Sequence, residues 1–283
     1  MEAATLRTRD HLGLHWRCWG PPAAQALRGR VLVVHGLGEH IARYDEVAHA
    51  LTADGWQVHG YDQRGHGRSP GPRGGLRADD DLLADLGAAI TKVRAEAPAG
   101  PLVLLGHSMG GAVAARFVAE GLQPVPAPWW QRVDALVLSS PALDPGLSAV
   151  QRGLIGLLAP LLPGLPAPNG LQPDWVSRDP TVVAAYRADP LVHGRITPRL
   201  ARFIVQAGAA VRAAAAQWTV PTLLLYAGAD RCVSPRGSEA FAAAAPGRCL
   251  TVHRHPGLYH EVFNEPERAE VLAQLRAWLA ALR

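Results

Sequence analysis

Short apolar runs that each end in a glycine or a polar turn set the strongest limit on how this chain can fold. Six such runs occur, at 31–34, 56–61, 102–105, 135–138, 222–226 and 250–253, the last being the most polar. Runs of this kind are typical of strands that are buried on both faces of a parallel sheet. Helical patterns separate them, at 44–54, 79–97, 110–120 and 267–282. This alternation predicts an α/β fold with a doubly wound, mostly parallel sheet. Residues 13–19 are expected to add an antiparallel edge strand.

The stretch from Asp144 to Gln217 interrupts the alternation. It is rich in Pro, Gly, Leu and Ala, and it contains short helical patterns but no clear strand. Regular strands resume at Thr222, so the stretch is predicted to be a helical cap inserted between two late strands. The expected organisation is a first core part at 1–143, a cap at 144–217 and a second core part at 218–283.

Composition and charge narrow the class of protein further. The chain has 283 residues, of which 48% are hydrophobic and 18% charged, as expected for a globular protein rather than a disordered one. The net charge of +4 is scattered without a dense basic block. A nucleic-acid partner is therefore not expected, whereas attraction to an anionic membrane surface stays open.

The cysteines and the amino terminus bear on the cellular compartment. Cys18, Cys232 and Cys249 show no C-x-x-C spacing, which predicts free thiols in a reducing compartment and no zinc site. Residues 1–7 lack the pattern of a secretory signal, and no apolar run approaches the roughly 20 residues that cross a bilayer. A cytoplasmic protein, peripheral at the membrane at most, is expected.

The pentapeptide at 106–110 supplies the candidate nucleophile. It reads Gly106-His107-Ser108-Met109-Gly110 and fits the pattern G-x-S-x-G. In this pattern the serine lies on a sharp strand-to-helix turn, and the glycines let the flanking chains approach closely. The apolar run before it and the small-residue helix after it are the context that the motif requires. Ser108 is therefore predicted to be the nucleophile rather than a helix cap.

A serine nucleophile needs a histidine as its base. In α/β folds that carry a G-x-S-x-G motif, the three catalytic residues follow the chain order serine, acid, histidine. The candidates for the base are therefore the histidines well beyond Ser108, namely His193, His253, His255 and His260. His253 and His255 alternate along the last strand, and His193 lies in the insertion. His260 follows the last strand in a loop, at the carboxyl edge of the sheet where Ser108 also lies. His260 is the predicted base.

The acid and the oxyanion donors are expected at the same carboxyl edge of the sheet. Asp230 comes just after the fifth apolar run and is the predicted acid, with Asp144 as its rival. One oxyanion donor in this fold comes from the loop after the first buried strand, and the other from the residue after the nucleophile. The backbone N–H groups of Leu37 and Met109 are therefore predicted to form the oxyanion hole. His35 is expected to brace the first loop.

Several longer motifs together resemble one family. They are H-G-L-G-E-H at 35–40 with Arg43-Tyr44, Y-D-Q-R-G-H-G-R-S at 61–69, G-H-S-M-G-G at 106–111, Ala229-Asp230, and Tyr259-His260-Glu261. With these motifs the chain resembles the monoacylglycerol lipase and lysophospholipase branch of the α/β hydrolases.

The resemblance implies hydrolysis of carboxylic esters with medium to long acyl chains, most of all monoacylglycerols, through an acyl-enzyme. It implies that Glu39 and Arg43 lie near the polar, glycerol-facing part of the site and that Tyr186 lies on the cap near the pocket. It requires no cofactor or metal. Lysophospholipase or general carboxylesterase activity is the main alternative, and a peptidase or a non-catalytic binding protein is a weaker one.

The apolar stretch at 154–162 bears on how a lipid would reach the site. Its simplest interpretation is a cap helix packed on the core. The alternative is that one face stays exposed and touches a membrane or lines an acyl channel.

Overall fold

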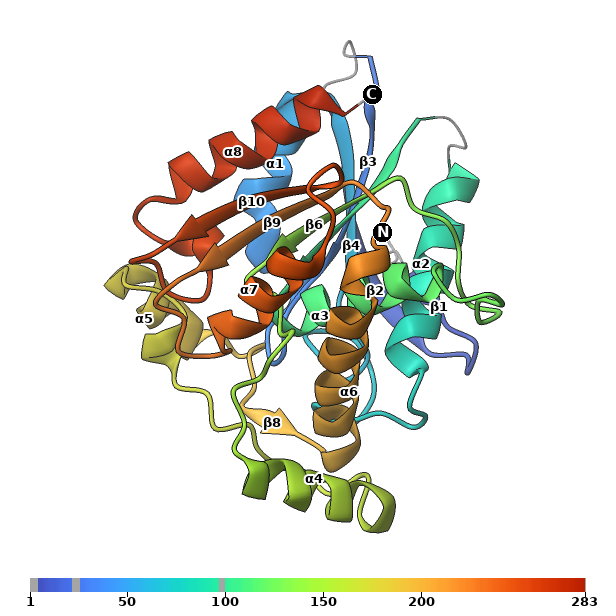
Figure 1. The fold of residues 1–283 in the computed structure, drawn as a ribbon, viewed down its shortest axis with the longest axis vertical. Helices are drawn as coiled ribbons and strands as arrows, with labels where there is room; N and C mark the ends of the chain where they lie inside the picture. Colours follow the sequence, from blue (N-terminus) through green and yellow to red (C-terminus); the bar gives the residue numbers. More distant parts are fainter. Residues whose placement is uncertain (1–4, 22–25, 97–99, 283) are drawn as a thin grey trace.

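A single eight-stranded sheet forms the centre of the molecule in the computed structural model, which describes residues 5–21, 26–96 and 100–282 (Figure 1). Its strands are β1 (Thr5–Arg7), β2 (Gly13–Trp19), β3 (Gly29–Val34), β4 (Trp56–Tyr61), β5 (Leu102–His107), β6 (Ala135–Ser139), β9 (Thr222–Ala227) and β10 (Leu250–His255). The order across the sheet is β1-β2-β4-β3-β5-β6-β9-β10. All pairs from β4 to β10 are parallel. The predicted fold class is confirmed.

The antiparallel end of the sheet differs from the prediction in one respect. β2 pairs antiparallel with β4, as expected, but it is not the edge strand. β1 pairs antiparallel with the other side of β2 and forms the edge. The sequence pattern missed β1 because a three-residue strand, in which only Leu6 is buried, shows too little alternation to be recognised.

Helices cover both faces of the sheet. They are α1 (Asp45–Ala53), α2 (Asp81–Glu96), α3 (Ser108–Glu120), α4 (Ala149–Leu161), α5 (Pro180–Ala188), α6 (Pro198–Ala214), α7 (Pro235–Ala244) and α8 (Arg268–Ala281), with short 3₁₀ helices at Ile41–Tyr44, Pro173–Trp175, Ala215–Gln217 and Val262–Asn264. Side chains of α1 and α8 join one hydrophobic core, and those of α2, α3, α6 and α7 join the other.

The central strands are apolar at nearly every position because each face has its own core. Along β3, Leu32 and Val34 belong to the core under α2 and α3, whereas Val31 and Val33 belong to the core under α1 and α8. All four side chains are completely buried. Alternate side chains of a strand point to opposite faces, so a sheet covered on both sides needs continuous apolar runs.

The inserted segment divides into two parts by its packing. Of the described residues at 144–195, none belongs to either hydrophobic core, whereas α6 contributes Leu200, Phe203 and Val211 to the core that it shares with α3. By its packing, α6 belongs with the sheet core, whereas the predicted cap at 144–217 stays a prediction. The segment also contains a two-residue strand pair, β7 (Ala167–Pro168) with β8 (Arg195–Ile196), which the sequence pattern did not predict.

Helix α4 is the least buried helix of the insertion. Of its thirteen residues, all of which the structure describes, only Ala159 is buried. Ser148 and Gln151 form a capping box at its amino end. Figure 1 shows α4 beyond the end of the sheet, at the bottom of the view.

Two expectations touch residues outside the described ranges. The absence of a secretory signal rests partly on residues 1–4, and the predicted helix at 79–97 ends at Ala97; both lie outside the part of the chain that the structure describes. Within the described part, no helix combines the length and the apolar character needed to cross a bilayer.

Candidate active site

Ser108 lies at the turn between β5 and α3, in a backbone conformation that side chains rarely adopt. Its φ angle is +53°, in the left-handed region. The turn is possible because β5 and α3 meet without side chains at their crossing. A Cβ atom on Gly106 would lie 2.6 Å from the carbonyl oxygen of Gly110, and one on Gly110 would overlap the carbonyl oxygen of Val34. Such strain at a predicted nucleophile is typical of a functional site.

The amino end of α3 faces the same place. Met109 is the second residue of this helix and is buried, and the side chain of His107 makes no capping hydrogen bond to it. The first N–H groups of a helix have no partner inside the helix and favour a negative charge. The Met109 amide is therefore suited to an oxyanion.

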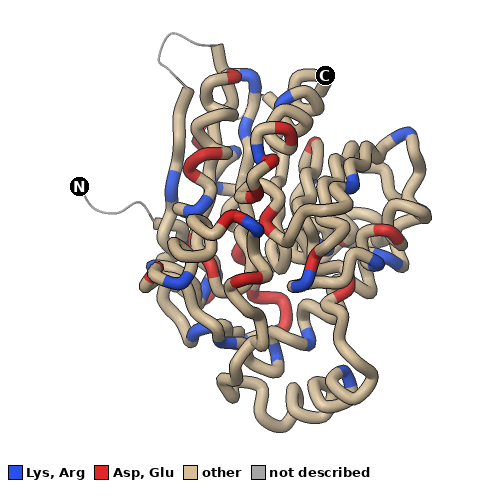
Figure 2. The backbone as a smooth tube through the Cα atoms, turned by 90° about the vertical axis from the view of Figure 1, so that its left-hand side faces the viewer, with Lys and Arg blue, Asp and Glu red and all other residues tan. Residues whose placement is uncertain are grey.

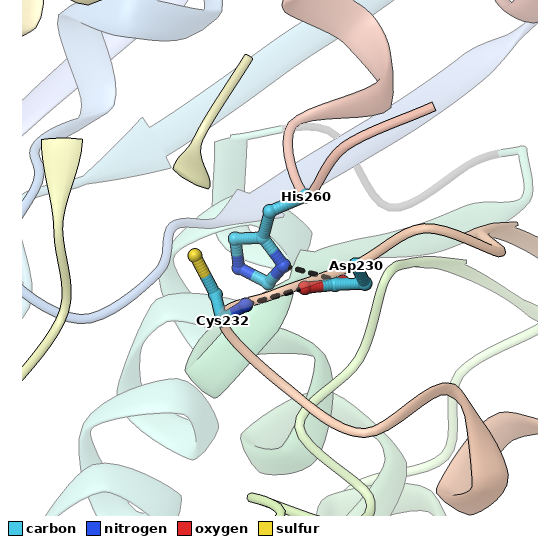
Figure 3. A group of neighbouring side chains, drawn as sticks. All are labelled: Asp230, Cys232 and His260. Carbon is cyan, nitrogen blue, oxygen red and sulfur yellow. Dashed lines mark hydrogen bonds and ion pairs between the residues drawn. The ribbon is translucent and has the colours of Figure 1, made fainter. Parts of the chain in front are cut away.

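His260 and Asp230 are directly hydrogen-bonded. Nδ1 of His260 donates to Oδ2 of Asp230 over 2.7 Å, and both side chains are buried (Figure 3). The other carboxylate oxygen of Asp230 accepts from the backbone N–H groups of Cys232, at 2.8 Å, and Val233, at 3.0 Å. Burial lowers the pKa of His260, but the Asp230 charge and hydrogen bond outweigh it, so the pKa is raised above its ordinary value.

His107 packs against His260 and directly precedes Ser108. The rings of His107 and His260 are 4.7 Å apart, and Ser108 directly follows His107 in the chain. Burial lowers the pKa of His107 to about 4, and the nearby His260 adds to this effect. His107 therefore stays neutral at physiological pH and does not repel a protonated His260. The structure thus brings Asp230 and His260 into contact, and the residue before Ser108 packs on the His260 ring.

The alternative candidates for the acid and the base make other contacts. Oδ1 of Asp144 accepts from the backbone of Gly146 at the start of the insertion. The ring of His193 packs on His66, with centroids 4.7 Å apart, and His255 contacts Gln274. None of these interactions involves Ser108.

The first loop is held by His35, as the sequence suggested. The backbone N–H of Gln63 donates to Nε2 of His35 over 2.9 Å, and the Gln63 amide donates to the His35 carbonyl over 2.6 Å. Leu37, two residues on, lines a cavity together with Ser108 and Met109. The two predicted oxyanion donors and the predicted nucleophile therefore belong to one wall.

Glu39 and Arg43 form a buried network behind this wall. Glu39 accepts from the backbone N–H of Gly36 over 2.5 Å and from the Tyr44 hydroxyl over 2.8 Å. Arg43 donates to Glu39 over 2.9 Å and to both carboxylate oxygens of Glu261, over 2.5 and 2.7 Å. Burial raises the pKa of Glu39, but the charge of Arg43 prevails and holds it at about 2.

The network links the loop at 36–40, which contains the predicted oxyanion donor Leu37, to the loop of His260, because Glu261 directly follows His260. It also reaches the insertion, since the Arg43 guanidinium lies 4.8 Å from the ring centre of Tyr186. Glu39, Arg43 and Tyr186 are thus side by side, but none of the three lines the cavity at Ser108. The sequence pattern placed Glu261 in a motif without assigning it a role.

The cavity at Ser108 has a volume of about 360 Å³ and is mostly apolar. Its walls include Leu154, Ile155 and Leu158 of α4 and Ile204 of α6. Among the described residues that line it, none is Asp, Glu, Lys or Arg. Cys232 also lines it, a position that sequence spacing could not reveal. Burial raises the pKa of the Cys232 thiol, and the Asp230 charge adds to the effect, so the thiol stays protonated near neutral pH.

The strand order, with a serine on the strand-to-helix turn after β5, defines the class of α/β hydrolases. Within that class, the chain belongs to the family described as Serine aminopeptidase, S33, whose model matches residues 25–267.

Known relatives agree with this assignment. The chain is 38% identical to a monoacylglycerol lipase of Mycolicibacterium smegmatis over 257 residues, which are 90% of this chain and 89% of that protein. It is 29% identical to the phospholipase YtpA of Bacillus subtilis, across 88% and 93% of the two chains. The crystal structure of Paleococcus ferrophilus monoacylglycerol lipase is similar, with a TM-score of 0.82, 32% identity, and coverage of 95% and 99%. The resemblance inferred from the motifs is confirmed, and the chain is a serine ester hydrolase.

Proposed function

We propose that this chain hydrolyses monoacylglycerols to glycerol and a fatty acid through an acyl-enzyme on Ser108. The single observation that carries the proposal is the cavity at Ser108, which is apolar, without charged lining residues, and large enough to take an acyl chain. The names of the relatives from M. smegmatis and P. ferrophilus support the same substrate class.

In the proposed mechanism, Oγ of Ser108 attacks the ester carbonyl while Nε2 of His260 takes its proton. The negative charge on the tetrahedral oxygen is held by the N–H groups of Leu37 and Met109, each worth about 3 kcal/mol in such sites. His260 then gives the proton to the departing alcohol, and the acyl group stays on Ser108. A water molecule releases the fatty acid by the same steps. Asp230 keeps the His260 ring oriented and stabilises its charged form.

The charges near the site favour a neutral alcohol over a phosphodiester. Arg43 is the cation in the buried network, and two carboxylates already hold it. A lysophospholipid phosphate would have to displace Glu39 or Glu261 to reach it. A peptidase that binds a free amino terminus needs a carboxylate there, and no described Asp or Glu lines the cavity. The family resemblance supports our assignment of Glu39, Arg43 and Tyr186 to the region near the alcohol end of the site, although none of the three lines the cavity at Ser108.

The exposed face of α4 supports contact with a lipid surface. Leu157 and Leu161 are 59% and 66% exposed, and Leu162 and Leu165 lie just beyond them, half exposed. From 145 to 173 the sequence carries a single charged residue, Arg152, and Figure 2 shows that stretch at the bottom of the view as nearly uncharged. We propose that this face touches the membrane or droplet from which the substrate comes.

A substrate panel tests the proposal. Initial rates on monoacylglycerols of increasing chain length, on lysophosphatidylcholine and on p-nitrophenyl acetate are compared for the wild type and Ser108→Ala. We expect the largest kcat/KM for monoacylglycerols with medium to long chains. Preference for the phospholipid, or activity confined to acetate, would overturn the substrate assignment. Labelling by a fluorophosphonate that persists in Ser108→Ala would overturn the nucleophile.

A further inference from the structure

A thiol lies beside the candidate base, and the proposed mechanism does not use it. Cys232 follows Asp230 by two residues in the loop after β9. Asp230, Cys232 and His260 each present one atom able to bind a metal, and these atoms all lie within 4.8 Å of one another. In Figure 3 the Cys232 sulfur lies on the side of the His260 ring whose nitrogen Asp230 does not hold.

Sulfur and imidazole nitrogen are the ligands that zinc prefers. Zinc binds them at about 2.3 and 2.0 Å in tetrahedral geometry, which separates the two ligand atoms by roughly 3.5 Å. Ligand atoms within 4.8 Å of one another need to close by only about an ångström to reach this separation. A histidine that binds a metal usually donates its other ring N–H to a carboxylate. His260 already donates Nδ1–H to Asp230 over 2.7 Å.

The cavity gives a cation a route to these atoms. Cys232 lines the same cavity of about 360 Å³ as Ser108. A small ion that enters the substrate cavity therefore meets the thiol and the histidine together.

Cysteine spacing alone predicts no zinc site, but the spatial grouping differs, and we propose that Sγ of Cys232 and Nε2 of His260 form an inhibitory site for a thiophilic divalent cation such as Zn²⁺, with Asp230 orienting the imidazole. The cation replaces the thiol proton, which passes to solvent, and forms one bond to sulfur and one to nitrogen, with no change of oxidation state. Nε2 then has no lone pair for the Ser108 proton. Hydrolysis stops until the cation is removed. The inhibition rests on the proposed function, but the binding does not.

Binding is tested without any catalytic readout. The Ser108→Ala protein that also carries Cys18→Ala and Cys249→Ala keeps Cys232 as its one thiol, and it is titrated with Cd²⁺. We expect the ultraviolet charge-transfer absorption of a cadmium thiolate at one equivalent. Adding His260→Ala should weaken the binding roughly tenfold or more, and adding Cys232→Ala should abolish the band. Absence of the band, or an affinity unchanged by His260→Ala, would overturn the site.

Inhibition is tested on the active enzyme. After treatment with EDTA, ester hydrolysis is measured against rising Zn²⁺, each variant being compared with its own metal-free rate. We expect inhibition that EDTA reverses, and a half-inhibitory concentration at least about tenfold higher in Cys232→Ala. Cys18→Ala and Cys249→Ala are the matched controls and should behave as wild type. Equal zinc sensitivity of all four proteins would overturn the proposed inhibition. An enzyme that hydrolyses no ester overturns the proposed function instead, and the Cd²⁺ titration still decides the site.

Discussion

The sheet core and the insertion at 144–195 are stabilised by different contacts, although both border the same cavity. Around Ser108 the strands are fully buried, and their backbones meet at glycines that leave no room for a side chain. In the insertion, α4 buries one residue and exposes Leu157 and Leu161. The predicted nucleophile is thus fixed by close packing, whereas the proposed acyl-chain cavity is bordered by a helix with little packing of its own. On the proposed function, chemistry and specificity would be encoded in separate parts of the chain.

The later part of the insertion is tied to the core more firmly than α4. The His193 N–H donates to the Gly38 carbonyl over 2.8 Å, and Nε2 of His40 lies 2.7 Å from the Asp189 carboxylate. The Glu261 N–H donates to the carbonyl of Val176 over 2.8 Å. These bonds join the insertion to the loop at 36–40 and to the loop that carries His260 and Glu261. Substitutions in the core should therefore alter rate or stability, and substitutions on α4 should alter access.

Loss of the nucleophile should have the largest effect. Ser108→Ala is expected to lower kcat by roughly 10⁶-fold, because no other group takes over the covalent step. Steady-state hydrolysis of a p-nitrophenyl ester measures the change, and circular dichroism checks the fold. A residual rate within 100-fold of wild type would contradict the assignment.

Replacing the acid should change both the rate and its pH dependence. Asp230→Asn is expected to lower kcat about 10⁴-fold, because the His260 ring loses its orienting carboxylate. In the wild type the Asp230 charge raises the pKa of His260, so activity should fall off at a pH above that of an ordinary histidine. In the variant the burial of His260 remains and the charge is gone, so the acid limb should move to lower pH. A kcat/KM profile whose acid limb does not move would contradict this.

Breaking the buried network should affect stability most. Arg43→Ala leaves Glu39 and Glu261 buried without their shared cation, and it should lower the free energy of unfolding by about 3–5 kcal/mol. Arg43→Lys should restore only part of this, because lysine lacks the bidentate geometry. The control is Arg187→Ala, whose ion pair with Asp174 is exposed and should contribute below about 1 kcal/mol. Urea unfolding of the three variants measures the difference.

The smallest effect on the folded protein is expected on α4. Leu157→Ser combined with Leu161→Ser should change the free energy of unfolding by less than about 0.5 kcal/mol, because both side chains are exposed. Neither residue lines the cavity, so hydrolysis of a soluble ester should not change. Binding to phosphatidylcholine vesicles, measured by sedimentation, should weaken by about tenfold or more. Vesicle binding equal to wild type would rule out this face as the lipid contact.

The parts of the fold that the sequence predicted well are those whose burial is uniform. Five of the six parallel strands, β3, β4, β5, β6 and β9, appear as apolar runs because both faces of the sheet are covered there, whereas the edge strand β10 is largely exposed and is the most polar run. Ser108 lies where its motif predicts. The three-residue edge strand and the β7–β8 pair escaped prediction because each is too short to show a period. Helix α6 lies inside the predicted cap at 144–217 and is amphipathic like many helices, so only the structure shows that its side chains join the core shared with α3.

Site residues could be predicted where their order along the chain identifies them. They could not be predicted where only the three-dimensional structure brings them next to their partners. His260 and Asp230 follow the last strands, and the structure shows them hydrogen-bonded. Their joint action with Ser108 stays a prediction, as do the oxyanion donors. Glu261 and Cys232 have no sequence pattern that reveals a role, because their partners are 218 residues away in one case and across a loop in the other.

The positive φ angle of Ser108 lowers the stability of the fold at the residue predicted to be needed for activity. A left-handed conformation costs a residue with a side chain about 1–2 kcal/mol, and glycine escapes most of that cost. Ser108→Gly should therefore unfold at a higher urea concentration than Ser108→Ala while both stay inactive. Selection for stability alone would remove this serine. Its presence in a strained position means that activity, rather than robustness, has governed this turn.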